Sequence, residues 1–79
     1  MEQVKDLILI IARELVDYPE QVSVEVKESE ATTIFELSVA KVDLGKVIGK
    51  HGRTADAIRT LLGAIAGKTH IRMMLEIIE

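Results

Sequence analysis

Apolar residues recur at helical spacing at the start of the chain. Within residues 2–16 one helical face collects Val4, Leu7, Ile8, Ile11 and Leu15. This spacing predicts an amphipathic helix, and Pro19 biases the preceding residue away from helix, so the helix ends before it. Three further apolar residues lie off that face: Leu9, Ile10 and Val16. They indicate either partial burial at the domain edge or a surface for a partner.

Two alternating stretches follow the predicted helix. Residues 22–27 place Val22, Val24 and Val26 on one side and polar residues on the other, which predicts a half-buried strand. Residues 28–31 are polar and short enough for a hairpin connection. The next stretch has Thr33, Phe35, Leu37 and Val39 on one side. It predicts a second, antiparallel strand with Phe35 in the core.

The remaining pattern predicts two helices and a last strand. Asp43 is a suitable N-cap for a short helix that reaches Ile48. A longer helix is expected over residues 53–66, closed by Gly67 as its C-cap. Its expected inner face consists of Ile58, Leu61 and Ile65. Beside this face, a flank is formed by Ala55, Leu62 and Ala66. The flank lies either at the core edge or at a helix contact between two copies of the protein. Alternation over residues 71–77 predicts the third strand.

This order, α-β-β-α-α-β, leaves room for one domain, residues 1–79. A strand, a helical pair and a strand in succession imply a crossover, because parallel strands cannot be joined by a hairpin. We therefore expect an α+β fold with a three-stranded mixed sheet and three helices packed on one face.

Composition narrows the functional classes. Apolar residues make up 48% of the chain and aromatic residues only 3%, which excludes the base-stacking sheets of RRM domains and typical OB-folds. Without cysteine there is no disulfide framework or thiolate metal site, which suits a reducing cytoplasm. No apolar run is long enough to span a bilayer. The two histidines are separated in sequence, so we expect no metal, no cofactor and no catalytic residues.

Charge is unevenly distributed. The net charge is −3, but residues 1–40 carry three Lys or Arg against nine Asp or Glu. Residues 41–72 carry seven basic residues against two acidic ones. A positive segment on an acidic chain is typical of a local binding face for a polyanion.

The positive segment surrounds two glycines three residues apart, in Val47-Ile48-Gly49-Lys50-His51-Gly52-Arg53. Glycines permit unusual backbone dihedrals and remove the Cβ atoms that would hold a sugar-phosphate strand away. The helix expected after Gly52 directs free N–H groups and its positive dipole end to the same place. A P-loop is excluded, because only three residues separate Gly45 from Gly49 and His51 stands where Ser or Thr is needed.

This stretch resembles the GxxG loop of the KH domain, which clamps about four backbone nucleotides of single-stranded nucleic acid. With residues 44–55 and nearly the whole length included, the chain looks like the small single-domain bacterial KH proteins of the KhpA type. The resemblance implies the type II KH fold. It also implies self-pairing, or pairing with a larger Jag/KhpB-type RNA-binding protein.

We therefore expect a non-catalytic binder of single-stranded RNA, with single-stranded DNA as a second ligand, acting as a broad RNA chaperone or post-transcriptional regulator. Gly49 and Gly52 are expected to permit close approach, and the cations Lys46, Lys50 and Arg53 to neutralise phosphates. His51 is either a phosphate contact or a tolerated loop residue. Val47, Ile48 and aliphatic residues of the second strand are expected to form an apolar floor for bases. Gly45 is interpreted as a packing position between helices. The alternative is a protein-interaction scaffold with a vestigial groove.

Overall fold

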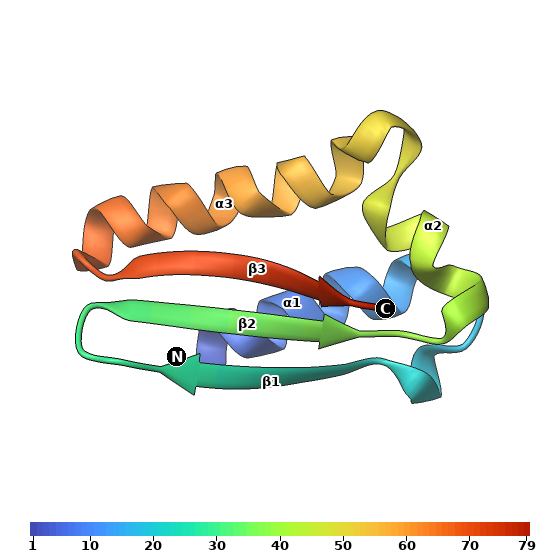
Figure 1. The fold of residues 1–79 in the computed structure, drawn as a ribbon, viewed down its shortest axis with the longest axis horizontal. Coiled ribbons are helices and arrows are strands. Elements are labelled where there is room, and N and C mark those ends of the chain that lie inside the picture. The colour runs from blue at the N-terminus through green and yellow to red at the C-terminus, as the bar shows by residue number, and fades with distance from the viewer.

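The computed structural model describes residues 1–79 and has the predicted order of elements (Figure 1). These are α1 (Glu2–Leu15), β1 (Ser23–Glu28), β2 (Thr32–Ser38), α2 (Leu44–Ile48), α3 (Arg53–Thr69) and β3 (Arg72–Ile78). Single 3₁₀ turns lie at Pro19–Gln21, Lys41–Asp43 and Lys50–Gly52. No helix is both long and apolar enough to cross a membrane.

The sheet is mixed, as predicted, with the order β1-β2-β3. β2 is central: it pairs antiparallel with β1 and parallel with β3. Phe35 therefore lies opposite Val26 on one side and opposite Leu75 on the other. Figure 1 shows α1 behind the sheet and α3 running along β3.

The core lies between one face of the sheet and the helices. Phe35 and Leu37 of β2 are fully buried at its centre, as expected from their alternation. From the helices it receives Ile8 and Ala12 of α1, Val47 of α2, and Ile58 and Leu62 of α3. Burial of these aliphatic side chains holds the helices on the sheet, at about 25 cal/mol per Å² of apolar surface removed from water.

The end of α3 differs from the prediction. The helix does not stop at Gly67 but continues to Thr69, and His70 takes the left-handed conformation at its C-cap, with φ 60° and ψ 26°. The His70 N–H donates to the Ala66 carbonyl at 2.8 Å, and the Thr69 hydroxyl donates to the Ile65 carbonyl at 3.0 Å. The helix therefore ends in the geometry usually provided by glycine, with a histidine in that place.

The inner face of α3 is also rotated from the expected one. Leu61, predicted to point inward, is 48% exposed, whereas Leu62 is 2% exposed and belongs to the core. Ala55, Ile58 and Leu62 form the buried stripe. Ala55 and Leu62, which were predicted to lie on the flank, therefore belong to the core face of the helix. The prediction that Leu61 points inward was wrong.

Candidate nucleic-acid interface

The glycine loop, residues 49–52, connects α2 to α3 and is stabilised by backbone hydrogen bonds. The Gly49 N–H donates to the Gly45 carbonyl at 2.9 Å, and the Gly52 N–H donates to the Gly49 carbonyl at 3.0 Å. Positive φ angles occur at Gly49 (80°), His51 (58°) and Gly52 (74°). Three such residues in four reverse the chain sharply, so that the side chains of Lys50 and His51 are exposed at its tip.

The two glycines have different surroundings. A Cβ built on Gly49 would overlap Thr54 Oγ1 and would lie 2.7 Å from the Thr54 backbone nitrogen. A Cβ on Gly52 would meet nothing within 4 Å. Gly49 is therefore needed for packing against the start of α3, and only Gly52 leaves open space beside the backbone.

Gly45 does not have the packing role expected of it. Its built Cβ meets nothing within 4 Å, and the residue is exposed on α2. No neighbouring helix therefore requires glycine at this position.

The predicted cations fall into two groups. Lys50, His51 and Arg53 are exposed and form no ion pair. Lys46 instead lies with its Nζ atom 3.3 Å from Asp17 Oδ2 and 3.5 Å from Asp43 Oδ1. The contact with Asp17, together with the charges of both carboxylates, raises the pKa of Lys46 above its ordinary value of 10.5.

Asp43 is the N-cap residue of α2, as predicted, but its side chain makes no capping hydrogen bond to the helix. Its fully buried carboxylate accepts hydrogen bonds from the backbone N–H groups of Asp17 and Tyr18, each at 3.1 Å. Asp43 therefore attaches the start of α2 to the segment between α1 and β1, and Lys46 supplies the counter-charge to the same carboxylate.

The two apolar residues predicted for the site are placed differently. Val47 is fully buried in the core, so it offers no surface to a ligand. Ile48, the last residue of α2, is 37% exposed beside the glycine loop. Only Ile48 of this pair is therefore accessible to a ligand.

A groove of about 360 Å³ begins at the glycine loop and runs between α3 and β3. We call it the loop groove. It is lined by Ile48, Gly52, Ala55, Arg59, Leu75, Glu76, Ile77 and Glu79. Its apolar wall comes from the third strand and not from the second as predicted, because β2 is the central strand and has a neighbour on each side.

Arg59 is a groove residue that the sequence interpretation missed. Its guanidinium Nη2 lies 3.5 Å from the Leu75 carbonyl oxygen of β3, and its Nη1 lies 3.5 Å from Asp56 Oδ1. Gly52 and Arg59 are seven residues apart, nearly two helical turns, so the spacing alone places them on one side of α3. Glu76 and Glu79 were missed as well, and they make the far wall of the groove acidic.

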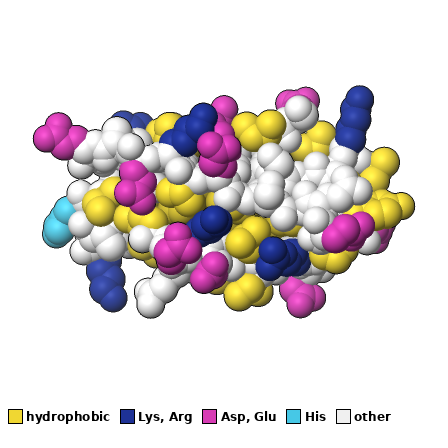
Figure 2. Space-filling model, turned by 90° about the horizontal axis from the view of Figure 1, so that it is seen from below, with side chains coloured by type: hydrophobic (Ala, Val, Ile, Leu, Met, Phe, Trp, Pro, Cys, Tyr) yellow, Lys and Arg dark blue, Asp and Glu magenta, His cyan; other side chains and the backbone are white.

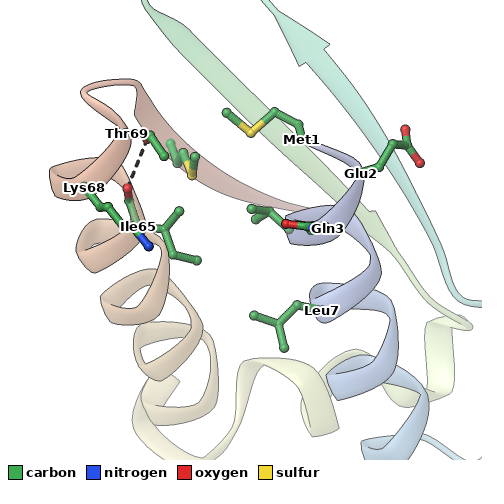
Figure 3. A pocket seen from close by; sticks show the side chains of 9 residues that line it. Met1, Glu2, Gln3, Leu7, Ile65, Lys68 and Thr69 are labelled. Atoms are coloured by element: carbon green, nitrogen blue, oxygen red, sulfur yellow. Dashed lines mark hydrogen bonds between the residues drawn. The ribbon is translucent and has the colours of Figure 1, made fainter.

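A second hollow of about 640 Å³ lies near the other end of α3, between it and the start of α1 (Figure 3). We call it the helix groove. Leu7 and Ile65 point toward each other across it, and Lys68 lies at its side. Neither groove contains a cluster of three or more His, Cys, Asp or Glu residues able to hold a metal ion.

Comparison with known proteins shows the family of this chain. The model of the KhpA/KhpB KH domain matches residues 5–77, which includes the glycine loop and both walls of the loop groove up to Ile77. The chain belongs to the KhpA/KhpB KH-domain family. Its fold is accordingly the type II KH fold expected from the resemblance.

Several bacterial members of this family are similar along nearly their whole length. The RNA-binding protein KhpA of Chlamydia pneumoniae is 49% identical over 75 residues, covering 95% of this chain and 96% of that protein. The RNA-binding protein KhpA of Borreliella burgdorferi is 51% identical over 74 residues, covering 94% and 90%. That of Listeria monocytogenes is 48% identical over 75 residues, covering 95% and 99%.

Proposed function

We propose that this chain is a non-catalytic module that binds single-stranded RNA by holding the sugar-phosphate backbone at the glycine loop. The observation that carries the proposal is the position of that loop. Gly52 of this loop lines the loop groove and leaves the backbone open, and the exposed cations Lys50 and Arg53 lie within two residues of it along the chain. The relatives, which are named RNA-binding proteins, support the same ligand class.

Phosphate is expected at the tip of the loop. Lys50 and Arg53 are exposed full charges on either side of Gly52, and His51 adds a hydrogen-bonding group between them. No side chain caps the N-terminus of α3, whose dipole also favours an anion there. Lys46 has a smaller part than its charge suggests, because two carboxylates already hold it.

Bases are expected to enter the loop groove. Ile48, Leu75 and Ile77 provide aliphatic surface, and Arg59 offers N–H donors at the edge of β3. Glu76 and Glu79 on the far wall repel phosphate, so the backbone is kept at the loop and the bases are turned toward the strand. Without aromatic stacking surfaces, sequence preference and affinity are expected to be modest.

A single modest clamp suits a broad RNA chaperone or post-transcriptional regulator more than a reader of one site. Binding through two linked modules raises the apparent affinity without new contacts. We therefore propose that the chain acts with a second copy of itself or with a larger Jag/KhpB-type protein, and that single-stranded DNA is a weaker ligand of the same groove.

The clamp is tested with matched charge reversals. Lys50→Asp should weaken binding to short single-stranded RNA about tenfold or more, and combining it with His51→Asp should weaken it further, because both remove phosphate contacts. Lys68→Asp makes the same change of charge near the far end of α3 and should have little effect. The measurement is fluorescence anisotropy with RNA and DNA oligomers of the same sequence. Unchanged RNA affinity in the double variant would contradict the clamp.

A scaffold function is the second candidate, supported by exposed apolar residues on the helices. Ile10 is 59% exposed, Leu61 48% and Leu7 38%, and Leu7 also lines the helix groove. If this function is the main one, the Lys50→Asp and His51→Asp changes leave RNA affinity low and unaltered, while Leu61→Asp reduces the binding of protein partners from a bacterial lysate.

A further inference from the structure

The two walls of the loop groove carry opposite charges. Arg59 of α3 lies on one wall, and Glu76 of β3 and Glu79 lie on the other. The volume of the groove is about 360 Å³, which falls within the range of about 300–1,000 Å³ that is usual for small-ligand sites. The groove is therefore large enough for a nucleobase, and its two walls offer different hydrogen-bonding groups to the two edges of such a ligand.

Arg59 supplies hydrogen-bond donors to the groove. Its Nη2 lies 3.5 Å from the Leu75 carbonyl oxygen and its Nη1 lies 3.5 Å from Asp56 Oδ1, which holds the guanidinium between α3 and β3. The side chain is 49% exposed, and a guanidinium has several N–H donors and no acceptor, so donors remain for a ligand. The contact with Leu75 also covers a carbonyl of the edge strand that would otherwise be free to accept from the amino group of a base.

The acidic wall supplies acceptors that no cation of the chain occupies. Glu76 and Glu79 are exposed, and neither forms an ion pair. Glu36 lies directly opposite Glu76 on β2, but it is Glu36 that pairs with Lys27, at 3.4 Å between Oε2 and Nζ. An ionised carboxylate only accepts hydrogen bonds. A ligand therefore meets donors at the α3 wall and acceptors at the β3 wall.

We propose that the loop groove selects guanine, with Arg59 donating to the O6 and N7 atoms and the Glu76 carboxylate accepting from the N1–H and N2–H groups. This inference rests on the proposed RNA binding and adds the class of base that the groove takes. Guanine has its O6 and N7 acceptors on one edge and the N2 amino donor on another, so it matches both walls. Glu79 provides a second carboxylate on the acceptor wall.

The other bases match these walls less well. Adenine and cytosine carry an amino group where guanine carries O6, so their donors would face the donors of Arg59. Their neighbouring ring nitrogen is an acceptor, and it would face the carboxylate of Glu76. Uracil has a carbonyl and one N–H group in the matching positions but lacks the second donor of guanine. The expected order of affinity is therefore guanine, then uracil, then adenine and cytosine.

Single-base replacements in RNA test the base preference. The ligands are cytidine octamers with guanosine, inosine or adenosine at the fourth position, and fluorescence anisotropy measures their affinity for the full chain. Inosine retains O6 and N1–H and lacks the N2 amino group. The native chain should bind the guanosine oligomer about fivefold more tightly than the adenosine oligomer, with the inosine oligomer between them.

A substitution on the donor wall should remove this preference. With Arg59→Met, the guanosine and inosine oligomers should bind no more tightly than the adenosine oligomer, because the donors to O6 are lost. Arg72→Met is the matched control. Arg72 is exposed on β3, forms no ion pair and lies outside the groove, so its loss should leave the preference for guanosine unchanged.

A substitution on the acceptor wall should change affinity and preference in opposite directions. Glu76→Gln removes a charge that repels phosphate, so all three oligomers should bind more tightly, while the advantage of guanosine over inosine should shrink. The control carboxylate comes from the side of the molecule with β1, shown in Figure 2, where acidic side chains lie among basic and apolar ones. Glu25 of β1 is exposed and lies outside the groove, so Glu25→Gln should keep the native preference.

The base preference and the clamp can fail separately. Equal affinity of the native chain for the guanosine and adenosine oligomers would overturn the preference, and so would a native preference in both Arg59→Met and Glu76→Gln. In either case a loss of affinity for all oligomers in Lys50→Asp would leave the clamp in place. A native chain that binds none of the oligomers would overturn both proposals.

Discussion

At the glycine loop, two residues of the same type have unlike roles. Gly49 combines a φ of 80° with a Cα that faces Thr54, so both dihedral strain and contact exclude a side chain. Gly52 has a φ of 74° but open space around it. His51 shares the left-handed conformation although it carries a side chain, which costs of the order of 1 kcal/mol and makes the loop a strained, exposed turn.

We predict that alanine substitutions separate these roles. Gly49→Ala should lower the free energy of unfolding by about 2 kcal/mol or more, since strain and overlap with Thr54 add. Gly52→Ala should cost about 1 kcal/mol, from dihedral strain alone. Gly45→Ala, in α2 with open space around it, should stabilise the chain by up to about 1 kcal/mol. Urea unfolding measures all three.

The RNA affinities of the same alanine variants then test where the RNA backbone approaches the protein. Gly52→Ala should weaken RNA binding more than its small effect on stability suggests, because it introduces a methyl group where the strand is expected to lie. Gly45→Ala serves as the control and should retain native affinity. A loss of affinity on changing Gly45, with Gly52→Ala unaffected, would move the contact surface from the glycine loop to α2.

At the level of elements, periodicity predicted every helix and strand, because alternation and helical spacing are local properties. The pattern also placed Phe35 and Leu37 in the core. The end of α3 was mispredicted because His70 adopts a conformation that sequence rules assign to glycine. Leu61 and Leu62 are adjacent apolar residues, and packing into the core decided which of them is buried.

The candidate site depended more on tertiary structure. Asp43 accepts hydrogen bonds from the backbone N–H groups of Asp17 and Tyr18, which lie 26 and 25 positions earlier in the chain. No local capping rule covers so large a separation. The groove wall was assigned to the second strand because strand order is not a local property of the sequence. The glycine loop and its cations could be predicted because their residues are adjacent along the chain.

The ion pairs of Lys46 with Asp17 and Asp43 make the free energy of unfolding depend on pH. Its pKa is raised in the folded chain by the contact with Asp17, so its contribution to stability is complete below the unfolded value of 10.5. The contribution is lost as pH rises through the higher folded pKa. We predict that Lys46→Met is less stable than the native chain by a constant amount from neutral pH to about pH 9. The difference should shrink above 10.5.

The comparison uses urea unfolding of both chains across this range, so that titration of other groups cancels. Lys68→Met is the control, because Lys68 forms no ion pair. A difference between Lys46→Met and the native chain that persisted unchanged well above pH 10.5 would show that packing of the lysine side chain, and not its charge, holds α2 to Asp17 and Asp43.

For the whole molecule, the net charge of −3 hides an uneven distribution along the chain, with nine acidic and three basic residues in 1–40 and two acidic and seven basic residues in 41–72. In the proposed complex we expect acidic residues elsewhere on the chain to repel RNA and the exposed cations at the glycine loop to attract it, so that charge orients the ligand before contact. The number of phosphates neutralised is nevertheless small. Lys46 and Arg59 already contact carboxylates, which leaves Lys50 and Arg53 as the exposed full charges beside Gly52.

This count predicts the salt dependence of RNA binding by one copy. Each phosphate neutralised on a single strand contributes about −0.7 to the slope of log K against log salt concentration, so two contacts give about −1.4. Lys50→Met should reduce the slope to about −0.7, and Lys68→Met should leave it unchanged. A native slope of about −3 would mean that Lys46 and Arg59 leave their carboxylates when RNA binds. In that event the Asp43 attachment would loosen on binding, and α2 would be a moving part of the clamp and not its fixed base.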